Sequence, residues 1–298
     1  MTLLLLSLLP DSNSLIPSPF TYVFVGLVGA VIGSFLNVVI HRLPREESIV
    51  LPSSKCPSCG TAIAFYDNVP VLSYVALRGR CRACKKGISI RYPAIELLTA
   101  LVFVAVTWRS GLSAALPFDL ILVSALVALV FIDAEHMILP NAITYPGMVF
   151  ALVARLAIPY LVGAPYFDDL PGLMQGLLAE FPLWAASVIG GFIGAMVGGG
   201  SLWLMGWTWE RLRGIEAMGL GDVKMMFMVG AYLGWRLTIL TIFIAVFAGS
   251  FVGIVMMVGQ GKKDMLLLLP FGVFLGIGAI VSLLVGPQIV DWYAGQFR

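Results

Sequence analysis

Long, nearly uninterrupted runs of apolar residues dominate the chain, and short polar segments separate them. A bilayer core is about 30 Å thick, and a helix needs about 20 apolar residues to cross it. Runs that approach this length predict eight transmembrane helices, of which the second, third and sixth are short. They cover residues 22–40, 94–108, 118–132, 144–162, 182–207, 223–235, 237–258 and 266–285.

Composition supports this interpretation and excludes an ordinary water-soluble domain. Hydrophobic residues make up 60% of the 298 positions and charged residues only 11%, and the mean hydropathy is +0.99. We therefore predict an all-α polytopic membrane protein whose first partner is the lipid bilayer, with no nucleic-acid partner. The expected parts are an N-terminal segment with the first helix (1–40), a polar loop domain (41–93) and a helix bundle (94–298).

The distribution of Lys and Arg predicts the orientation in the membrane. Loops rich in these residues stay in the cytoplasm. If the first helix runs from outside to inside, the inner loops hold all of the 18 Lys and Arg except Arg109, Arg155, Arg236 and Arg298. The net charge of +2 then conceals a strongly basic cytoplasmic face.

Two aspartates lie where apolar runs meet polar segments. Asp133 follows the apolar run 120–132, and Asp222 precedes the sixth predicted helix. Acids at membrane depth are costly, so they indicate a functional site. Two complete crossings separate the pair, which places both carboxylates on the cytoplasmic side. The sequence thus predicts an aspartate dyad, although Asp222 alone is equally typical of a helix N-terminal cap.

All four cysteines fall in the polar loop, as the pairs Cys56 and Cys59 and Cys81 and Cys84. Two CxxC pairs at this separation are typical of a structural zinc site with four thiolate ligands. Metal binding would also stabilise a loop too small to fold on a core of its own. The alternative is two disulfides, which a reducing cytoplasm disfavours. A catalytic zinc is disfavoured because four cysteines leave no coordination position open for water.

Glycines in the fifth predicted helix recur at the spacing of close helix packing. They are Gly190, Gly191, Gly194, Gly198, Gly199 and Gly200. We expect helix contacts from them, with no ligand-binding role.

Several short strings, in order along the chain, carry a resemblance to a known family. They are residues 33–44 (GSFLNVVIHRLP), the two CxxC pairs, 68–74 (NVPVLSY), 77–81 (LRGRC), 91–93 (RYP), 132–136 (IDAEH), 139–141 (LPN) and 219–224 (GLGDVK). In combination the strings resemble the type IV prepilin peptidases, bifunctional leader peptidases and N-methyltransferases of bacterial inner membranes. The resemblance extends from about residue 23 to residue 285.

The resemblance implies an activity and its residues. Asp133 and Asp222 are then the catalytic aspartates, facing the cytoplasm. The substrates are prepilins or pseudopilins with a short basic leader, a glycine before the cut and an apolar helix after it. The new N-terminus is methylated from S-adenosylmethionine, whose binding residues carry no fingerprint here and are expected near the zinc loop.

Two positions beside the dyad are less clear from the sequence. The family often has Asp where this chain has Asn141. Lys224, two residues after Asp222, is expected either to pair with a carboxylate or to extend to lipid phosphates.

Two other classes of function stay open at this stage. A proton-coupled transporter with a zinc-binding cap would use the acids to carry protons, but no pair of interrupted helices indicates its inverted repeat. A non-catalytic assembly scaffold for a secretion machine would not need either aspartate. The sequence leaves open which pilus or secretion system is served, and the oligomeric state.

Overall fold

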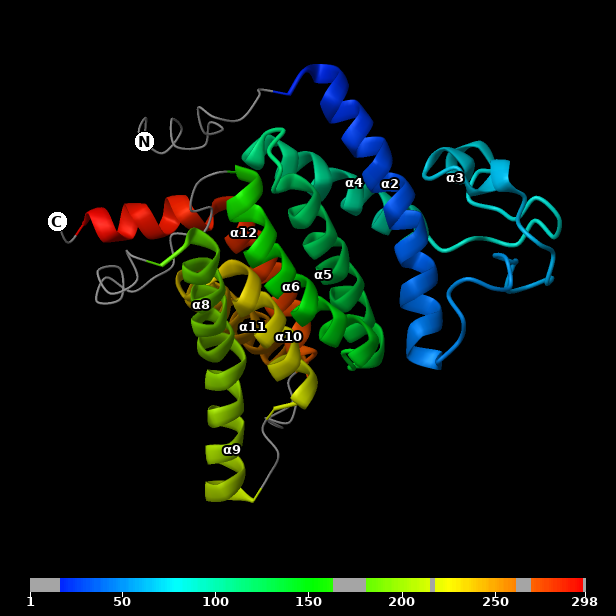
Figure 1. The fold of residues 1–298 in the computed structure, drawn as a ribbon. Helices are drawn as coiled ribbons and strands as arrows, with labels where there is room; N and C mark the ends of the chain where they lie inside the picture. Colours follow the sequence, from blue (N-terminus) through cyan, green and yellow to red (C-terminus); the bar gives the residue numbers. More distant parts are fainter. Residues whose placement is uncertain (1–16, 163–180, 215–217, 261–268, 297–298) are drawn as a thin grey trace. The chain divides into compact units, whose positions relative to one another are not determined.

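The computed structural model describes residues 17–162, 181–214, 218–260 and 269–296, and Figure 1 shows their helical path. The predicted N-terminal segment before residue 17 and the start of the eighth predicted helix lie outside these residues. The described residues form two compact units, one of residues 17–112 and 119–128 and the other of residues 113–118 together with the described residues from 129 onward. The predicted domain boundaries stay a prediction.

In the first unit, α2 (Pro19–Arg42) and α4 (Arg91–Ser110) lie side by side and antiparallel. Glycines allow the close approach: a Cβ at Gly29 would lie 2.8 Å from Ala100 Cα, and one at Gly33 would lie 2.7 Å from Glu96 Cα. Between the two helices the chain forms η1 (Leu43–Arg45), η2 (Phe65–Asn68) and the short α3 (Leu72–Ala76).

The loop between α2 and α4 has almost no apolar interior. Between residues 43 and 90, Cys56 is the only buried residue. The Val71 amide donates to Glu96 Oε2 at 2.8 Å and joins the loop to α4. Asn37 Nδ2 donates to the Tyr92 carbonyl at 3.1 Å and joins α2 to the first turn of α4. The loop therefore depends on polar contacts and on its cysteines for shape.

The helix α5 runs through Leu116–His136 and is shared between the two units. The second unit continues with α6 (Asn141–Val162), α8 (Leu183–Ala195), the π-helical η3 (Met196–Gly200) and α9 (Ser201–Arg213). It ends with α10 (Leu220–Leu233), α11 (Trp235–Gln260) and α12 (Phe271–Gly295). The segments α8, η3 and α9 form one continuous helix (Figure 1).

Within the residues that the structure describes, all eight predicted helices are present, and seven of the helices are long and apolar enough to span a membrane. The exception is α10, the sixth, with 14 residues. It contacts α6, α8, α11 and α12, and Met225, Met226, Val229 and Tyr232 are fully buried. Because protein surrounds it, α10 does not need the length of a lipid-facing helix.

Gly194 of α8 and Gly230 of α10 meet backbone to backbone, which confirms the predicted packing role of the glycines. A Cβ on either residue would collide with the carbonyl oxygen of the other. A backbone atom cannot rotate away as a side chain can, so the helices would have to separate.

We expect Gly194→Ala to destabilise the bundle by about 1–3 kcal/mol, the usual cost of overpacking. Thermal unfolding in detergent, followed by tryptophan fluorescence, measures the change. Gly206→Ala in α9 is the matched control, because a Cβ there meets only Met218 at 3.8 Å and alanine favours the helix. Equal midpoints for the two variants would contradict the packing role.

Candidate active site and candidate metal centre

Asp133 lies in the last turn of α5, which continues one turn beyond the predicted boundary to His136. Its side chain is buried, and Oδ2 accepts a hydrogen bond from the Val273 amide at 3.0 Å. The Gly272 amide also interacts with this carboxylate. Both amides belong to the first turn of α12, where N–H groups lack helical partners and favour an anion. The α12 N-terminus thus holds the Asp133 carboxylate.

Asp222 lies in the first turn of α10 and is partly buried. The N-cap residue is Gly219, so the cap that the sequence offered as an alternative for Asp222 is not its position. Asp133 is close enough for its charge to act on the Asp222 carboxyl group. Residues 89 positions apart therefore share one electrostatic environment.

Leu139 lies between the segments that carry the two acids. A Cβ on Gly221 would lie 3.0 Å from Leu139 Cβ, and one on Gly272 would lie 3.0 Å from Leu139 Cδ1. That same Gly272 Cβ would lie 2.8 Å from Asp133 Oδ2. Glycine at both positions lets the first turns of α10 and α12 approach the end of α5. The site is thus built from three helix ends around one leucine.

The four cysteines meet in one cluster, as their spacing predicts. Their sulfur atoms lie within 4.8 Å of one another, and the sulfurs of Cys56 and Cys84 are 3.9 Å apart. A disulfide requires about 2.05 Å, whereas tetrahedral zinc with bonds of about 2.3 Å separates its sulfurs by about 3.8 Å. The cluster fits a four-thiolate metal ion and does not fit two disulfides.

The two CxxC segments form equivalent turns. In the first, the Cys56 amide donates to the Thr61 carbonyl and the Gly60 amide to the Cys56 carbonyl. In the second, the Cys81 amide donates to Lys86 and the Lys85 amide to Cys81 in the same pattern. Isolated β-bridges flank both turns, Lys55 with Ala62 and Arg80 with Gly87. We call these the first and the second knuckle.

The thiols of the cluster have widely separated proton affinities. Hydrogen bonds with the Thr61 side chain and backbone lower the pKa of Cys59 to about 6. The Lys86 amide lowers the pKa of Cys84, but burial and the neighbouring thiols outweigh it and raise this pKa to about 11. Negative charges this close repel one another, so four thiolates need a cation among them.

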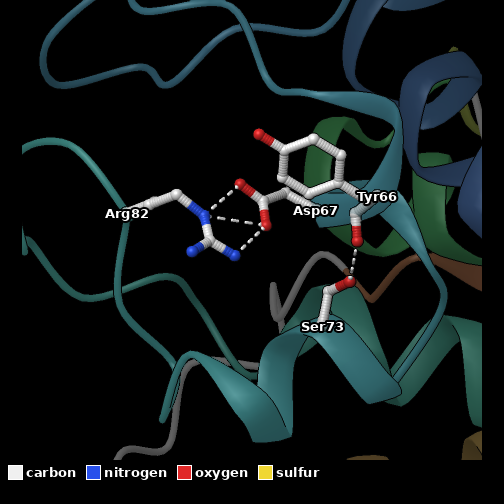
Figure 2. Close-up of polar contacts among 4 residues, drawn as sticks. All are labelled: Tyr66, Asp67, Ser73 and Arg82. Atoms are coloured by element: carbon white, nitrogen blue, oxygen red, sulfur yellow. Dashed lines mark hydrogen bonds and ion pairs between the residues drawn. The ribbon is translucent and has the colours of Figure 1, made fainter.

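Arg82 fastens the second knuckle to η2 (Figure 2). Its guanidinium donates to both carboxylate oxygens of Asp67, with Nη2 to Oδ1 at 2.6 Å, and holds the pKa of Asp67 below its usual value. Nearby, the Ser73 hydroxyl donates to the Tyr66 carbonyl at 3.0 Å and connects α3 to η2. Through η2, these contacts connect the second knuckle to α3.

Comparison with known proteins follows the same division of the chain. A family profile described as the bacterial peptidase A24 N-terminal domain matches residues 27–110, which include the cysteine cluster. A second, described as the type IV leader peptidase family, matches residues 120–254, which include both aspartates. No solved structure gives a significant match.

Several curated relatives carry the name prepilin leader peptidase/N-methyltransferase. The protein from Pseudomonas aeruginosa is 34% identical over 90% of this chain and 91% of its own length. The protein from Aeromonas hydrophila is 36% identical over 93% of this chain and 94% of its own. This chain belongs to the type IV leader peptidase family. A third relative, from Myxococcus xanthus, is 40% identical over 82% of this chain, which spans 65% of that protein.

As a member of the type IV leader peptidase family, the chain is a multi-pass bacterial inner-membrane protein. Its Asn141, where the family often has Asp, accepts a hydrogen bond from Lys224 Nζ at 2.9 Å. The Lys224 ammonium also lies over the Tyr145 ring, 5.0 Å from the centroid. Both partners of Lys224 belong to α6 and neither is a carboxylate, so Lys224 joins α10 to α6.

Sequence reasoning missed the contribution of α12 to this leader peptidase site. Gly272 and Val273 contain no chemistry-bearing side chain, and the sequence placed them inside the predicted helix 266–285. The available signal was the string Pro270, Phe271 and Gly272. Proline indicates the start of a helix, and glycine in the first turn indicates that another group approaches the backbone closely there.

Proposed function

We propose that this leader peptidase cleaves the basic leaders of type IV prepilins or pseudopilins with Asp133 and Asp222 as its catalytic pair. The observation that supports the proposal is that Leu139, just after α5, packs against the first turns of both α10 and α12, while the Val273 amide of α12 holds the Asp133 carboxylate. The names of the relatives support the substrate class and a second activity, methylation of the new N-terminus.

A carboxylate pair can hydrolyse a peptide bond without a covalent intermediate. One carboxylate takes a proton from water while the other, protonated, gives its proton to the scissile carbonyl oxygen. We assign the charged role to Asp133, because the Val273 and Gly272 amides stabilise its anion, and the acid role to Asp222. When the tetrahedral intermediate breaks down, the proton on Asp133 passes to the leaving amine. Asp222 recovers a proton from a hydroxyl group of the intermediate.

The pair is placed at the cytoplasmic surface in this proposal. Two spanning segments, α6 and the continuous helix of α8, η3 and α9, separate Asp133 from Asp222. An even number of crossings returns the chain to the same side. The basic inner loops place that side in the cytoplasm, where a prepilin leader is located.

The cysteine cluster is proposed to hold zinc in a structural role. The four thiolates of Cys56, Cys59, Cys81 and Cys84 would complete a tetrahedral shell and cross-link the two knuckles. S-adenosylmethionine is proposed as methyl donor from the names of the relatives, with its binding residues unassigned.

Cleavage of a co-expressed prepilin in a host without its own leader peptidase tests the function. Mass spectrometry of the pilin should show loss of the leader and a gain of about one methyl mass on the new N-terminus. If the prepilin stays uncut although the protein is folded and inserted in the membrane, the peptidase function is excluded, and the transporter or scaffold function is favoured.

Gly272→Ala tests the role of α12 in positioning Asp133. The added Cβ would lie 2.8 Å from Oδ2, so the carboxylate must move although no charge changes. We expect the cleavage rate to fall about ten- to a hundred-fold, because small misplacements of catalytic groups lower reaction rates by this much. Initial rates on purified prepilin in detergent give the measurement.

Gly249→Ala is the control for that substitution, because the nearest atom to its Cβ would be in the Phe274 ring at 3.4 Å, an ordinary van der Waals contact. Its cleavage rate should match the wild type. If Gly272→Ala also cleaves at the wild-type rate, contact with α12 does not position Asp133 for the reaction.

A further inference from the structure

A cavity of about 320 Å³ opens beside the second knuckle, between it and the end of α3. Its lining is Leu77, Arg78, Arg80, Cys81 and Lys85. Three of these five residues are cationic, and no carboxylate lines the cavity. The adjacent Arg82 differs, since Asp67 takes up its charge. The cavity is therefore suited to an anion.

Backbone conformation gives a second, independent indication. Gly60 in the first knuckle and Lys85 in the second occupy the same position after the second cysteine, with φ of 71° and 59°. This left-handed region suits glycine and is costly for a residue with a Cβ. Arg78 is also left-handed, with φ of 52°. Two of the three cations thus occupy strained positions, a pattern that accompanies functional sites.

Apolar side chains in the same loop are exposed to solvent. Leu72 and Val75, one turn apart on α3, are each 67% exposed, and Phe65 of η2 is 88% exposed. Exposed apolar residues next to Lys and Arg are typical of a surface that contacts a bilayer with anionic lipids. Since α2 and α4, both candidate spans, bound the loop, the bilayer surface is within reach of it.

We propose that this cavity binds the phosphate group of an anionic phospholipid, with Leu72 and Val75 contacting the acyl region beside it. A basic prepilin leader, the substrate under the proposed function, would be repelled by Arg78, Arg80 and Lys85. Lipid binding would fix the zinc loop at the membrane surface and is independent of the aspartate chemistry.

Native mass spectrometry of the full-length, zinc-loaded protein in neutral detergent tests the proposal. Phosphatidylglycerol is titrated against wild type, Arg80→Gln and Lys85→Gly, with phosphatidylcholine as neutral lipid. We expect each variant to weaken phosphatidylglycerol binding about five-fold, the effect of one basic residue at a membrane surface. Phosphatidylcholine binding should not change. Lys85→Gly removes the charge while giving the second knuckle the glycine that the first already has.

Lys55→Gln is the matched control, because Lys55 precedes the first knuckle as Arg80 precedes the second and does not line the cavity. It should bind phosphatidylglycerol like the wild type. Equal binding by all variants at equal zinc content would overturn the proposal. Displacement of the lipid by millimolar inorganic phosphate would also overturn it, and would assign the cavity to soluble phosphate.

Discussion

Asp133→Asn and Asp222→Asn are each expected to lower leader cleavage by at least about 10³-fold, because each removes one of the two proton-transfer groups. Asn has the size of Asp, but its amide can neither take a proton from water nor give one to the scissile carbonyl oxygen. Asn at 133 keeps an oxygen that accepts the Val273 amide, so α12 should stay in place. Initial rates on purified prepilin provide the measurement.

Two controls separate lost chemistry from lost structure in these variants. Asp291→Asn in α12 alters an exposed acid of the same unit and should cleave normally. A pilin supplied without its leader should still be methylated by both dyad variants, since that step needs no peptide hydrolysis. Cleavage above a tenth of the wild-type rate in either variant would exclude that aspartate from the reaction.

The membrane architecture was predictable because the bilayer imposes a length and an apolar character on each spanning segment. The prediction was least accurate at helix ends. The third helix extends past the predicted residue 132 to His136, because Asp133 is satisfied by α12 and does not have to end the helix. The burial of α10 likewise depends on four neighbouring helices, which a pattern along one segment cannot show.

The two halves of the candidate dyad were predictable for a different reason. An acid in an apolar chain is costly, so Asp133 and Asp222 were conspicuous without any structure. The groups that position them are not conspicuous. Val273 contributes only a backbone amide, 140 positions from Asp133, and Leu139 contributes only bulk. Long-range contacts of backbone and apolar groups leave no signature in composition or spacing.

The second knuckle shows the same limit at short range. The CxxC spacing predicted four converging sulfurs, which the structure brings together. The sequence did not reveal that Lys85 takes the left-handed position held by glycine in the first knuckle. Lysine is unusual there, so local propensity favoured another conformation. The hydrogen bonds of the second knuckle hold Lys85 in the left-handed conformation.

Removal of the metal is expected to unfold the polar loop while the helix bundle remains. With Cys56 as the only buried residue between positions 43 and 90, the loop lacks the apolar core that would replace the metal. Structural zinc sites in small domains contribute about 10–16 kcal/mol of apparent binding free energy at neutral pH. We therefore expect one zinc per chain in the purified protein, and rapid tryptic cleavage at the loop's Lys and Arg after chelation.

Cys84→Ser should reproduce the effect of the chelator, with zinc lost and the loop cut by trypsin, whereas Ser58→Ala in the first knuckle should keep both zinc and protection. Metal analysis and limited proteolysis provide the readouts.

A protein that resists chelators but whose loop opens on reduction would contain disulfides. The distance of 3.9 Å between the sulfurs of Cys56 and Cys84 argues against that outcome. Survival of the loop under both treatments would show that its polar contacts suffice, among them the Asp67 and Arg82 pair. That pair alone is weak, because the Arg82 side chain is 58% exposed and water screens its charge. The metal is thus expected to determine whether the loop is folded.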